Sequence, residues 1–186
     1  MIDDLVCSLQ LDREALIPIP PSEPDDFVYK ITGRVLCGTL HEEKDRLAGR
    51  FRIYYVDFAT GANYGYSARE VLDACSDTYT YADVLLGQSD KPFSHRLEKL
   101  LRFEVWNPNF FVLDRVEILP QYRGRGVGLL AILSLMERFA AGVGVVGMKP
   151  FPLGLSPFLE RDMARESVSR TSDRIARASV DTVALT

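Results

Sequence analysis

Residues 110–128 read FFVLDRVEILPQYRGRGVG, and this stretch decides the fold. Residues 110–119 are rich in β-branched and aromatic side chains and have the length of a strand. Pro120 ends that strand. After residues 121–122, residues 123–128 contain three glycines. The chain is then apolar at nearly every position from 129 to 141. We therefore predict a strand, a glycine-rich loop and a helix, in that order.

The helix predicted over residues 129–141 has only three polar side chains, which belong to Ser134, Glu137 and Arg138. Because they stand at positions i, i+3 and i+4, they form one narrow polar face, and we expect the rest of the helix to be buried. Gly142 ends the helix, and the apolar residues 143–148 are predicted to follow as a buried strand.

Three glycines directly before a helix are typical of a loop that receives an anion. Glycine has no Cβ, so a ligand can approach the main chain closely, and the first amides of a helix are unpaired donors with partial positive charge. Phosphate is the usual ligand, and Arg123 and Arg125 add positive charge here. The alternative is that the glycines only form a tight turn and the arginines are only solvated.

Spacing excludes two other nucleotide motifs. The dinucleotide pattern GxGxxG requires glycine at position 129, where Leu129 stands, and it opens directly from a strand rather than after residues 120–122. A Walker A loop requires Gly-Lys-Ser or Gly-Lys-Thr, and neither tripeptide occurs in the chain. NAD and ATP are therefore not expected as ligands.

Residues 116–128, VEILPQYRGRGVG, resemble motif A of the GNAT superfamily of acyl-CoA-dependent N-acyltransferases. The family pattern Gln/Arg-x-x-Gly-x-Gly/Ala is filled by Arg123, Gly126 and Gly128. The match covers roughly residues 112–148, and residues 27–106 agree with the family in outline only. The resemblance implies an α/β (α+β) fold with a mixed, mainly antiparallel sheet between helices. It also implies that the strand ending near Leu119 splays from the strand at 143–148, where the pantetheine arm of acyl-CoA lies.

The resemblance also implies where acetyl-CoA, the acyl donor, is bound. Main-chain groups of Val116 and Ile118 pair with the pantetheine amides, and the Ile118 N–H donates to the thioester carbonyl. Such a preorganised amide stabilises the oxyanion of acyl transfer. No metal is implied, and the acceptor is a small-molecule or peptide amine. The pyrophosphate sits on backbone amides of Arg123, Gly124, Arg125, Gly126, Val127 and Gly128.

A general base is needed to take a proton from the acceptor amine. Glu117 is the first candidate because it lies on the strand that enters the motif, and Asp114 and Glu104 come next. His41 and His95 stand in polar contexts and are expected at the surface.

The orientation of Glu117 depends on the regularity of its strand. Strict alternation places it on one face with residues 113, 115 and 119, and places Asp114 on the other with residues 116 and 118, unless a bulge or twist intervenes. The alternative role for Glu117 is an ordinary ion pair with Arg115 or Arg123.

The remainder of the chain divides into three parts. Residues 1–26 end in a proline-rich run and are expected to be a lead-in without a compact element. Residues 27–154 form the acyltransferase-like domain. Residues 155–186 are polar, rich in Arg, Ser and acidic residues, and are expected to be a flexible or partner-docked segment.

Within residues 27–106 we predict strands over 27–40 and 49–57, joined by a polar connection. Gly61 to Gly65 break the pattern, and Ser67 with Glu70 forms a capping box for a helix that reaches about Leu86. Residues 95–101 have the spacing of a short helix.

Two further hypotheses stay open. Many family members use a C-terminal Tyr as general acid to the departing thiolate, and residues 154–186 contain no Tyr. The chain would then be a non-catalytic acyl-CoA-binding or regulatory module. The third hypothesis is an interaction protein whose contact surface consists of Tyr64, Tyr66, Tyr79 and Tyr81.

The composition fits one soluble globular domain of 186 residues, with 47% hydrophobic and 26% charged residues. Its net charge of −4 gives no basic footprint for nucleic acid. Three widely spread cysteines without CxxC spacing argue against a disulfide framework and a zinc site. No stretch approaches 18 uninterrupted apolar residues, so we expect a cytoplasmic protein without a membrane partner. A homodimer is the commonest assembly of small enzymes.

Overall fold

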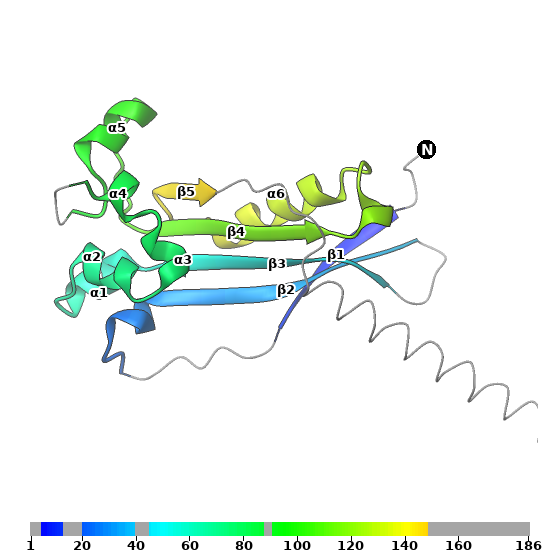
Figure 1. Cartoon of the computed structure of the whole chain (residues 1–186), viewed down its shortest axis with the longest axis horizontal. Helices are drawn as coiled ribbons and strands as arrows, with labels where there is room; N and C mark the ends of the chain where they lie inside the picture. Colours follow the sequence, from blue (N-terminus) through cyan, green and yellow to red (C-terminus); the bar gives the residue numbers. More distant parts are fainter. Residues whose placement is uncertain (1–4, 13–19, 40–44, 88–90, 149–186) are drawn as a thin grey trace, which may run out of the picture. The chain divides into compact units, whose positions relative to one another are not determined.

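One five-stranded sheet, in the order β1-β2-β3-β4-β5, organises the computed structural model (Figure 1). The structure describes residues 5–12, 20–39, 45–87 and 91–148, all within the compact unit Met1–Pro150. Neighbouring strands from β1 to β4 are antiparallel, and β5 is parallel to β4. The mixed α+β class and the mainly antiparallel sheet are thus as predicted. The strands are β1 (Leu5–Leu11), β2 (Val28–Thr39), β3 (Arg46–Val56), β4 (Phe110–Ile118) and β5 (Val145–Met148).

Strand β1 lies in the segment that was expected to be a lead-in, and that expectation is wrong for Leu5–Leu11. Leu5 to Leu11 pair in register with Thr39 to Gly33 of β2. The prolines that suggested an irregular segment begin only at position 18, so they do not affect these residues. The predicted boundary at 154 and the segment 155–186 lie outside the described residues.

In the described part of the chain, five short helices separate β3 from β4: α1 (Phe58–Asn63), α2 (Ala68–Asp73), α3 (Ser76–Tyr79), α4 (Ala82–Leu85) and α5 (His95–Leu101). The capping box is confirmed, because Ser67 Oγ accepts from the Glu70 N–H and Glu70 Oε2 accepts from the Ser67 N–H. The single helix expected to Leu86 is wrong: three helices replace it. The backbone is extended at Cys75, which interrupts the helix. The buried Thr78 hydroxyl donates to the Leu72 and Cys75 carbonyls at this break.

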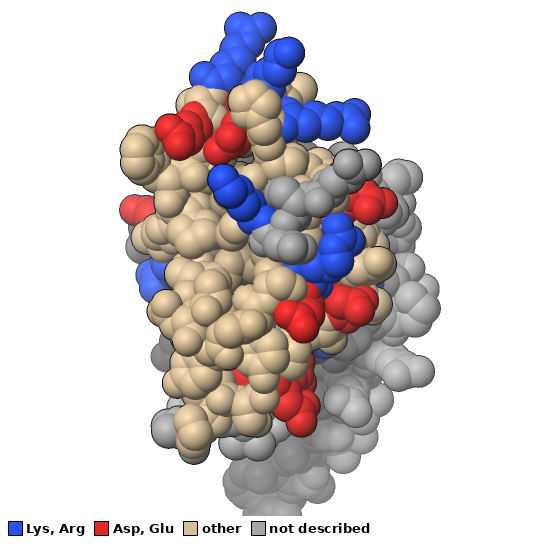
Figure 2. Space-filling view, turned by 90° about the vertical axis from the view of Figure 1, so that its left-hand side faces the viewer, with Lys and Arg blue, Asp and Glu red and all other residues tan. Residues whose placement is uncertain are grey.

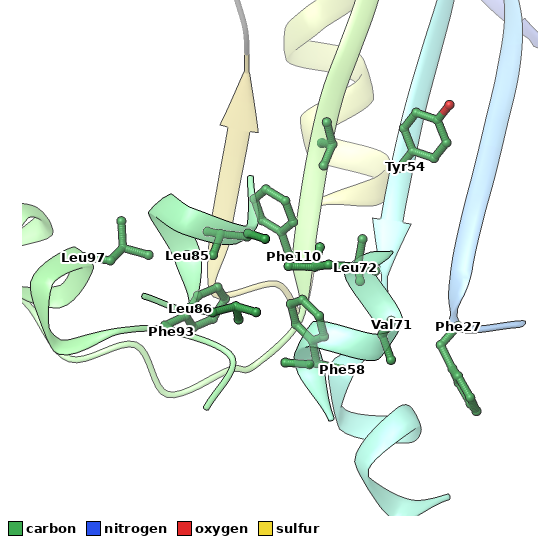
Figure 3. Packing of buried hydrophobic residues seen from close by; sticks show 14 residues of the cluster. Phe27, Tyr54, Phe58, Val71, Leu72, Leu85, Leu86, Phe93, Leu97 and Phe110 are labelled. Atoms are coloured by element: carbon green, nitrogen blue, oxygen red, sulfur yellow. The ribbon is translucent and has the colours of Figure 1, made fainter. Parts of the chain in front are cut away.

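The sheet has a hydrophobic core on each face. One core joins the sheet to the short helices and contains Phe27, Tyr54, Phe58, Leu72 and Phe110 (Figure 3). The other lies under α6 (Val127–Phe139) and contains side chains such as Val35, Ile53, Phe111, Leu113 and Leu135. Two 3₁₀ turns, Pro24–Phe27 and Pro120–Tyr122, precede β2 and the glycine loop.

Helix α6 is less buried than the sequence predicts. Val127, Ala131 and Leu135 are its buried residues, at positions i, i+4 and i+8, so the helix buries one narrow stripe. Its outward side is apolar: Leu129, Leu130, Leu133 and Met136 are exposed. The strand predicted as buried, β5, alternates between half-buried and exposed residues because it is the outer strand of the described sheet. No helix in the described part of the chain is long and apolar enough to span a membrane.

Candidate functional site

The glycine loop adopts the backbone that its sequence requires. Gly124 has a φ of 70° and Gly126, the N-cap of α6, has a φ of 76°. An L residue in this left-handed region costs roughly 1–2 kcal/mol, so the turn itself accounts for both glycines. In addition, a Cβ at either position would meet nothing within 4 Å. The main chain of the loop is therefore open to an approaching ligand.

The two loop arginines differ in their environments. Arg123 Nε donates to the Ile118 carbonyl oxygen at 2.8 Å, which ties the loop to the end of β4. Arg125 is exposed. Leu130 N–H donates to the Gly126 carbonyl at 3.0 Å as the first bond of the helical ladder, so the N–H groups of the three residues before Leu130 lie in the first turn, where a helix has no internal acceptor for them.

The backbone of β4 directs specific groups toward its β5 side. The Leu119 N–H donates to the Ala48 carbonyl of β3 at 2.8 Å. This hydrogen bond shows which residues at the end of β4 direct their backbone N–H and C=O groups toward β3. By alternation, the N–H and C=O groups of Val116 and Ile118 point away from β3. Within the described residues, β5 pairs only with Phe110–Leu113. Val116 and Ile118 therefore lie in a part of β4 that the described residues of β5 do not reach.

The loop and this part of β4 are in contact. A Cβ on Gly128 would lie 3.4 Å from Ile118 Cγ1, an ordinary packing distance. The Val116 and Ile118 side chains pack against the core under α6. The structure therefore brings together the eight residues predicted to bind the acyl donor: Val116, Ile118, Arg123, Gly124, Arg125, Gly126, Val127 and Gly128.

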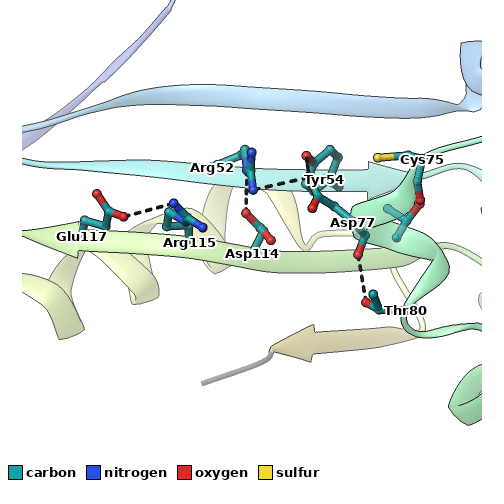
Figure 4. Close-up of polar contacts among 9 residues, drawn as sticks. Arg52, Tyr54, Cys75, Asp77, Thr80, Asp114, Arg115 and Glu117 are labelled. Carbon is teal, nitrogen blue, oxygen red and sulfur yellow. Dashed lines mark hydrogen bonds and ion pairs between the residues drawn. The ribbon is translucent and has the colours of Figure 1, made fainter. Parts of the chain in front are cut away.

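A bulge in β4 changes which residues share a face. The β3–β4 register passes from Arg52 opposite Arg115 to Ile53 opposite Leu113, so Asp114 is the extra residue. Asp114 therefore lies on the same face as Arg115 and Glu117, opposite to α6 (Figure 4). The strict alternation that would have grouped Asp114 with Val116 and Ile118 is wrong for this reason.

Glu117 is buried and paired. Arg115 Nη1 lies 3.3 Å from Glu117 Oε1, so the ion-pair alternative for Glu117 is present in the structure. The carboxylate is on the face away from α6, while the glycine loop enters α6 on the other face. Glu104 is exposed in the irregular segment before β4, and His95 is exposed on α5. His41 lies outside the described residues.

A polar network next to Glu117 was not predicted. Arg52 Nε donates to Asp114 Oδ2 at 2.6 Å, and Arg52 Nη2 lies 3.4 Å from Asp77 Oδ2. The Tyr54 hydroxyl donates to the same Asp77 oxygen at 2.5 Å. Period-two alternation in β3 could have placed Arg52 and Tyr54 on one face. Asp77 comes from α3, and no local pattern joins it to them.

Charge and burial in this network shift two pKa values. Burial and the hydrogen bond to Asp77 raise the pKa of Tyr54 above its ordinary value, against the lowering effect of Arg52. Burial alone would lower the pKa of Arg52, but its hydrogen bond with Asp114 and the charge of Asp114 raise it. Arg52 therefore holds the Asp77 and Asp114 carboxylates close together on this face of the sheet.

We expect Tyr54→Phe to lose about 1–2 kcal/mol of stability near neutral pH, because a buried hydrogen bond to a carboxylate is removed. The pKa of Tyr54 is raised in the folded state. The hydrogen bond to Asp77 therefore contributes its full stabilisation of the fold below the ordinary pKa of 10.0, and this stabilisation declines as the pH rises through the folded pKa. The stability gap to the parent chain should therefore narrow above about pH 10 in urea titrations. Tyr64→Phe, at an exposed tyrosine, is the control. A gap independent of pH would contradict the assignment.

The tyrosines of the interaction hypothesis do not form one uniform surface. Tyr64 and Tyr79 are about half exposed. Tyr66 packs on Phe27 and donates its hydroxyl to the Ser22 carbonyl, and Tyr81 packs edge-on against Phe110. From the side on which α1 and α2 lie, charges of both signs are visible, and Lys and Arg side chains gather at the upper end (Figure 2).

A surface pocket lies between the 3₁₀ turn Pro24–Phe27 and α2. A cavity of about 350 Å³ is lined by Pro24, Asp25, Glu70, Asp73 and Ala74, none of which is a predicted site residue. No group of three or more His, Cys, Asp or Glu side chains in the described ranges is placed to hold a metal ion.

Comparison of the chain with protein-family models, with curated proteins and with solved structures finds no match.

Proposed function

We propose that the protein is an N-acetyltransferase that moves the acetyl group of acetyl-CoA to a primary amine by direct attack. One observation carries this proposal: the open glycine loop at the start of α6 lies against the stretch of β4 whose backbone groups point away from β3. An anion on the loop amides and an extended amide chain along β4 are the two ends of one ligand, a diphosphate joined to a pantetheine arm.

The proposed reaction follows from the directions of these groups. The amine nitrogen attacks the thioester carbonyl, a C–N bond forms, and the C–S bond then breaks to release the thiolate of CoA. The Ile118 N–H stabilises the negative charge on the carbonyl oxygen. The amine loses a proton to a base, and the thiolate gains one to leave as the free thiol.

Glu117 is the proposed base, and its position limits how it acts. Its carboxylate lies on the sheet face away from α6 and is paired with Arg115. The amine would therefore approach from that face, on which Asp77 and Asp114 also lie, each paired with Arg52. A small-molecule or peptide amine fits this requirement. A homodimer and a cytoplasmic location remain predictions from the sequence.

The second candidate function is a non-catalytic acyl-CoA-binding or regulatory module. The pairing of Glu117 with Arg115, and of Asp114 with Arg52, favours it, because both carboxylates already have cationic partners. This module needs the same loop and the same β4 edge but no proton acceptor. Turnover therefore separates the two functions, whereas binding of acetyl-CoA does not.

Turnover is measured as release of CoA thiol from acetyl-CoA in the presence of a panel of primary amines. We expect amine-dependent release by the parent chain. Glu117→Gln should lower kcat about 10²–10⁴-fold, the usual contribution of a general base, and change the affinity for acetyl-CoA far less. Glu104→Gln, at an exposed carboxylate in the irregular segment before β4, is the matched control and should retain activity.

The results have separate meanings. Binding of acetyl-CoA without release of CoA for any amine supports the non-catalytic module. Release that is unchanged in Glu117→Gln, with an unchanged pH–rate profile, rejects Glu117 as the base. Absence of both binding and release rejects both functions.

A further inference from the structure

Two cysteines that are distant in the sequence face each other in the sheet. Cys7 of β1 is the register partner of Cys37 of β2. The Asp12 N–H donates to the Thr32 carbonyl, and the alternation that follows makes Cys7 and Cys37 a non-hydrogen-bonded pair. In such a pair the Cα atoms are about 4.5 Å apart and the side chains are close, which lies within the range for a disulfide bridge.

The two sulfur atoms are already in contact. Cys7 Sγ and Cys37 Sγ are 2.6 Å apart, and both residues are free thiols. Cys37 is buried beneath α6, whereas Cys7 lies on the outer strand of the described sheet and is half-buried. An oxidant can therefore reach the pair from the side of Cys7.

The surroundings give the two thiols different roles. Burial, the hydrogen bond with Cys7 and the negative charge of Asp45 raise the pKa of Cys37 to about 12, so its thiol stays protonated at neutral pH. Asp45 itself is held near Cys7 by a hydrogen bond from Ser8 Oγ to its Oδ2 at 3.2 Å. Because Cys7 is the more accessible of the two, it is the thiol that reacts first with an oxidant from solvent, and Cys37, whose sulfur contacts that of Cys7, is the thiol that resolves the product.

We propose that Cys7 and Cys37 form a modification site that is oxidised to a disulfide by hydrogen peroxide. The Cys7 sulfur attacks one peroxide oxygen, the O–O bond breaks, and a sulfenic acid and one water result. The Cys37 sulfur then attacks the sulfenic sulfur, an S–S bond forms, and a second water leaves. Two thiols and one hydrogen peroxide thus give one disulfide and two waters, with the thiols oxidised and the peroxide reduced.

The third cysteine provides an internal control. Cys75 precedes α3 and packs against the core on the other face of the sheet, so the strands separate it from the pair. A disulfide that forms only between Cys7 and Cys37 would therefore reflect the folded sheet and not merely the presence of three thiols in the chain. The proposal does not depend on the acyltransferase function.

The experiment uses the reduced, folded chain, treated with hydrogen peroxide at near-stoichiometric concentration. Unreacted thiols are then counted in denaturant, and the intact mass is measured. The three thiols should fall to one, with the loss of two hydrogen atoms per chain. A tryptic digest should show residues 1–13 linked to residues 35–44. The yield should not depend on protein concentration, because the reaction is intramolecular.

Two variants make the test specific. Cys75→Ser should lose both of its thiols at the same rate as the parent chain loses two. Cys7→Ser, at the half-buried position, leaves Cys37 without a partner and should form no intramolecular bridge. Three thiols remaining in the parent chain, a bridge that includes Cys75, disulfide-linked dimers, or sulfinic acid at Cys7 without a bridge would each overturn the proposal. A reduced Cys7→Ser chain with native circular dichroism confirms that the variant is folded.

Discussion

Gly126→Glu is expected to abolish the rise in melting temperature that we predict acetyl-CoA to give the parent chain. A ligand that binds only the folded state stabilises it by RT ln(1 + [L]/Kd), about 2.7 kcal/mol at one hundred times Kd. For a chain of this size that corresponds to a rise of about 5–10 °C. Gly126 has open space where its Cβ would be, so Glu would place bulk and negative charge where the pyrophosphate is proposed to lie.

A matched variant separates the ligand effect from the cost of the substitution. Gly126→Ala carries the same backbone penalty at a φ of 76° but adds neither charge nor length. Both variants should therefore melt below the parent chain without ligand, and only Gly126→Ala should retain a rise with acetyl-CoA or CoA. Differential scanning calorimetry gives each rise relative to the same chain without ligand. A full rise in Gly126→Glu would mean that the diphosphate lies elsewhere.

The second large effect concerns Gly49 in β3. A Cβ at this position would collide with the backbone oxygen of Glu117 and would lie 2.8 Å from Ile118 Cδ1. Because a strand backbone cannot rotate aside as a side chain does, we expect Gly49→Ala to destabilise the fold by roughly 1–3 kcal/mol. For a chain of this size, the melting temperature should fall by about 2–12 °C.

The same exchange at Gly128 is the control. Its Cβ would make only an ordinary contact with Ile118, and alanine in the first turn of a helix is more favourable than glycine by about 0.5–1 kcal/mol. Gly128→Ala should therefore raise the melting temperature slightly. Equal effects of the two substitutions in thermal unfolding would contradict the packing described between β3 and β4.

Local patterns predicted the elements whose side chains interact with near neighbours. The Ser67–Glu70 capping box, the helix at His95–Leu101 and the strand before the glycine loop all depend on residues a few positions apart. The glycine loop could also be located, because positive φ at Gly124 and Gly126 is a local requirement. These features need no knowledge of the tertiary structure.

Features set by distant partners were missed. β1 exists because its residues find β2, and the contact between Cys7 and Cys37 follows from that register rather than from sequence spacing. The exposed side of α6 could not be predicted, because an apolar helix indicates only that something apolar can cover it. Asp77 contacts Arg52 and Tyr54 because of the way α3 packs, and no motif in residues 67–86 indicates this packing.

The bulge at Asp114 has a consequence for chain length in β4. Side chains directed toward α6 are odd-numbered before it, as Phe111 and Leu113 are, and even-numbered after it, as Val116 is. A deletion of one residue at position 114 or 115 leaves every other side chain of the strand on its present face. A deletion between 116 and 118 turns the residues that follow it toward the opposite layer. Single-residue deletions accepted in this strand should therefore concentrate at these two positions.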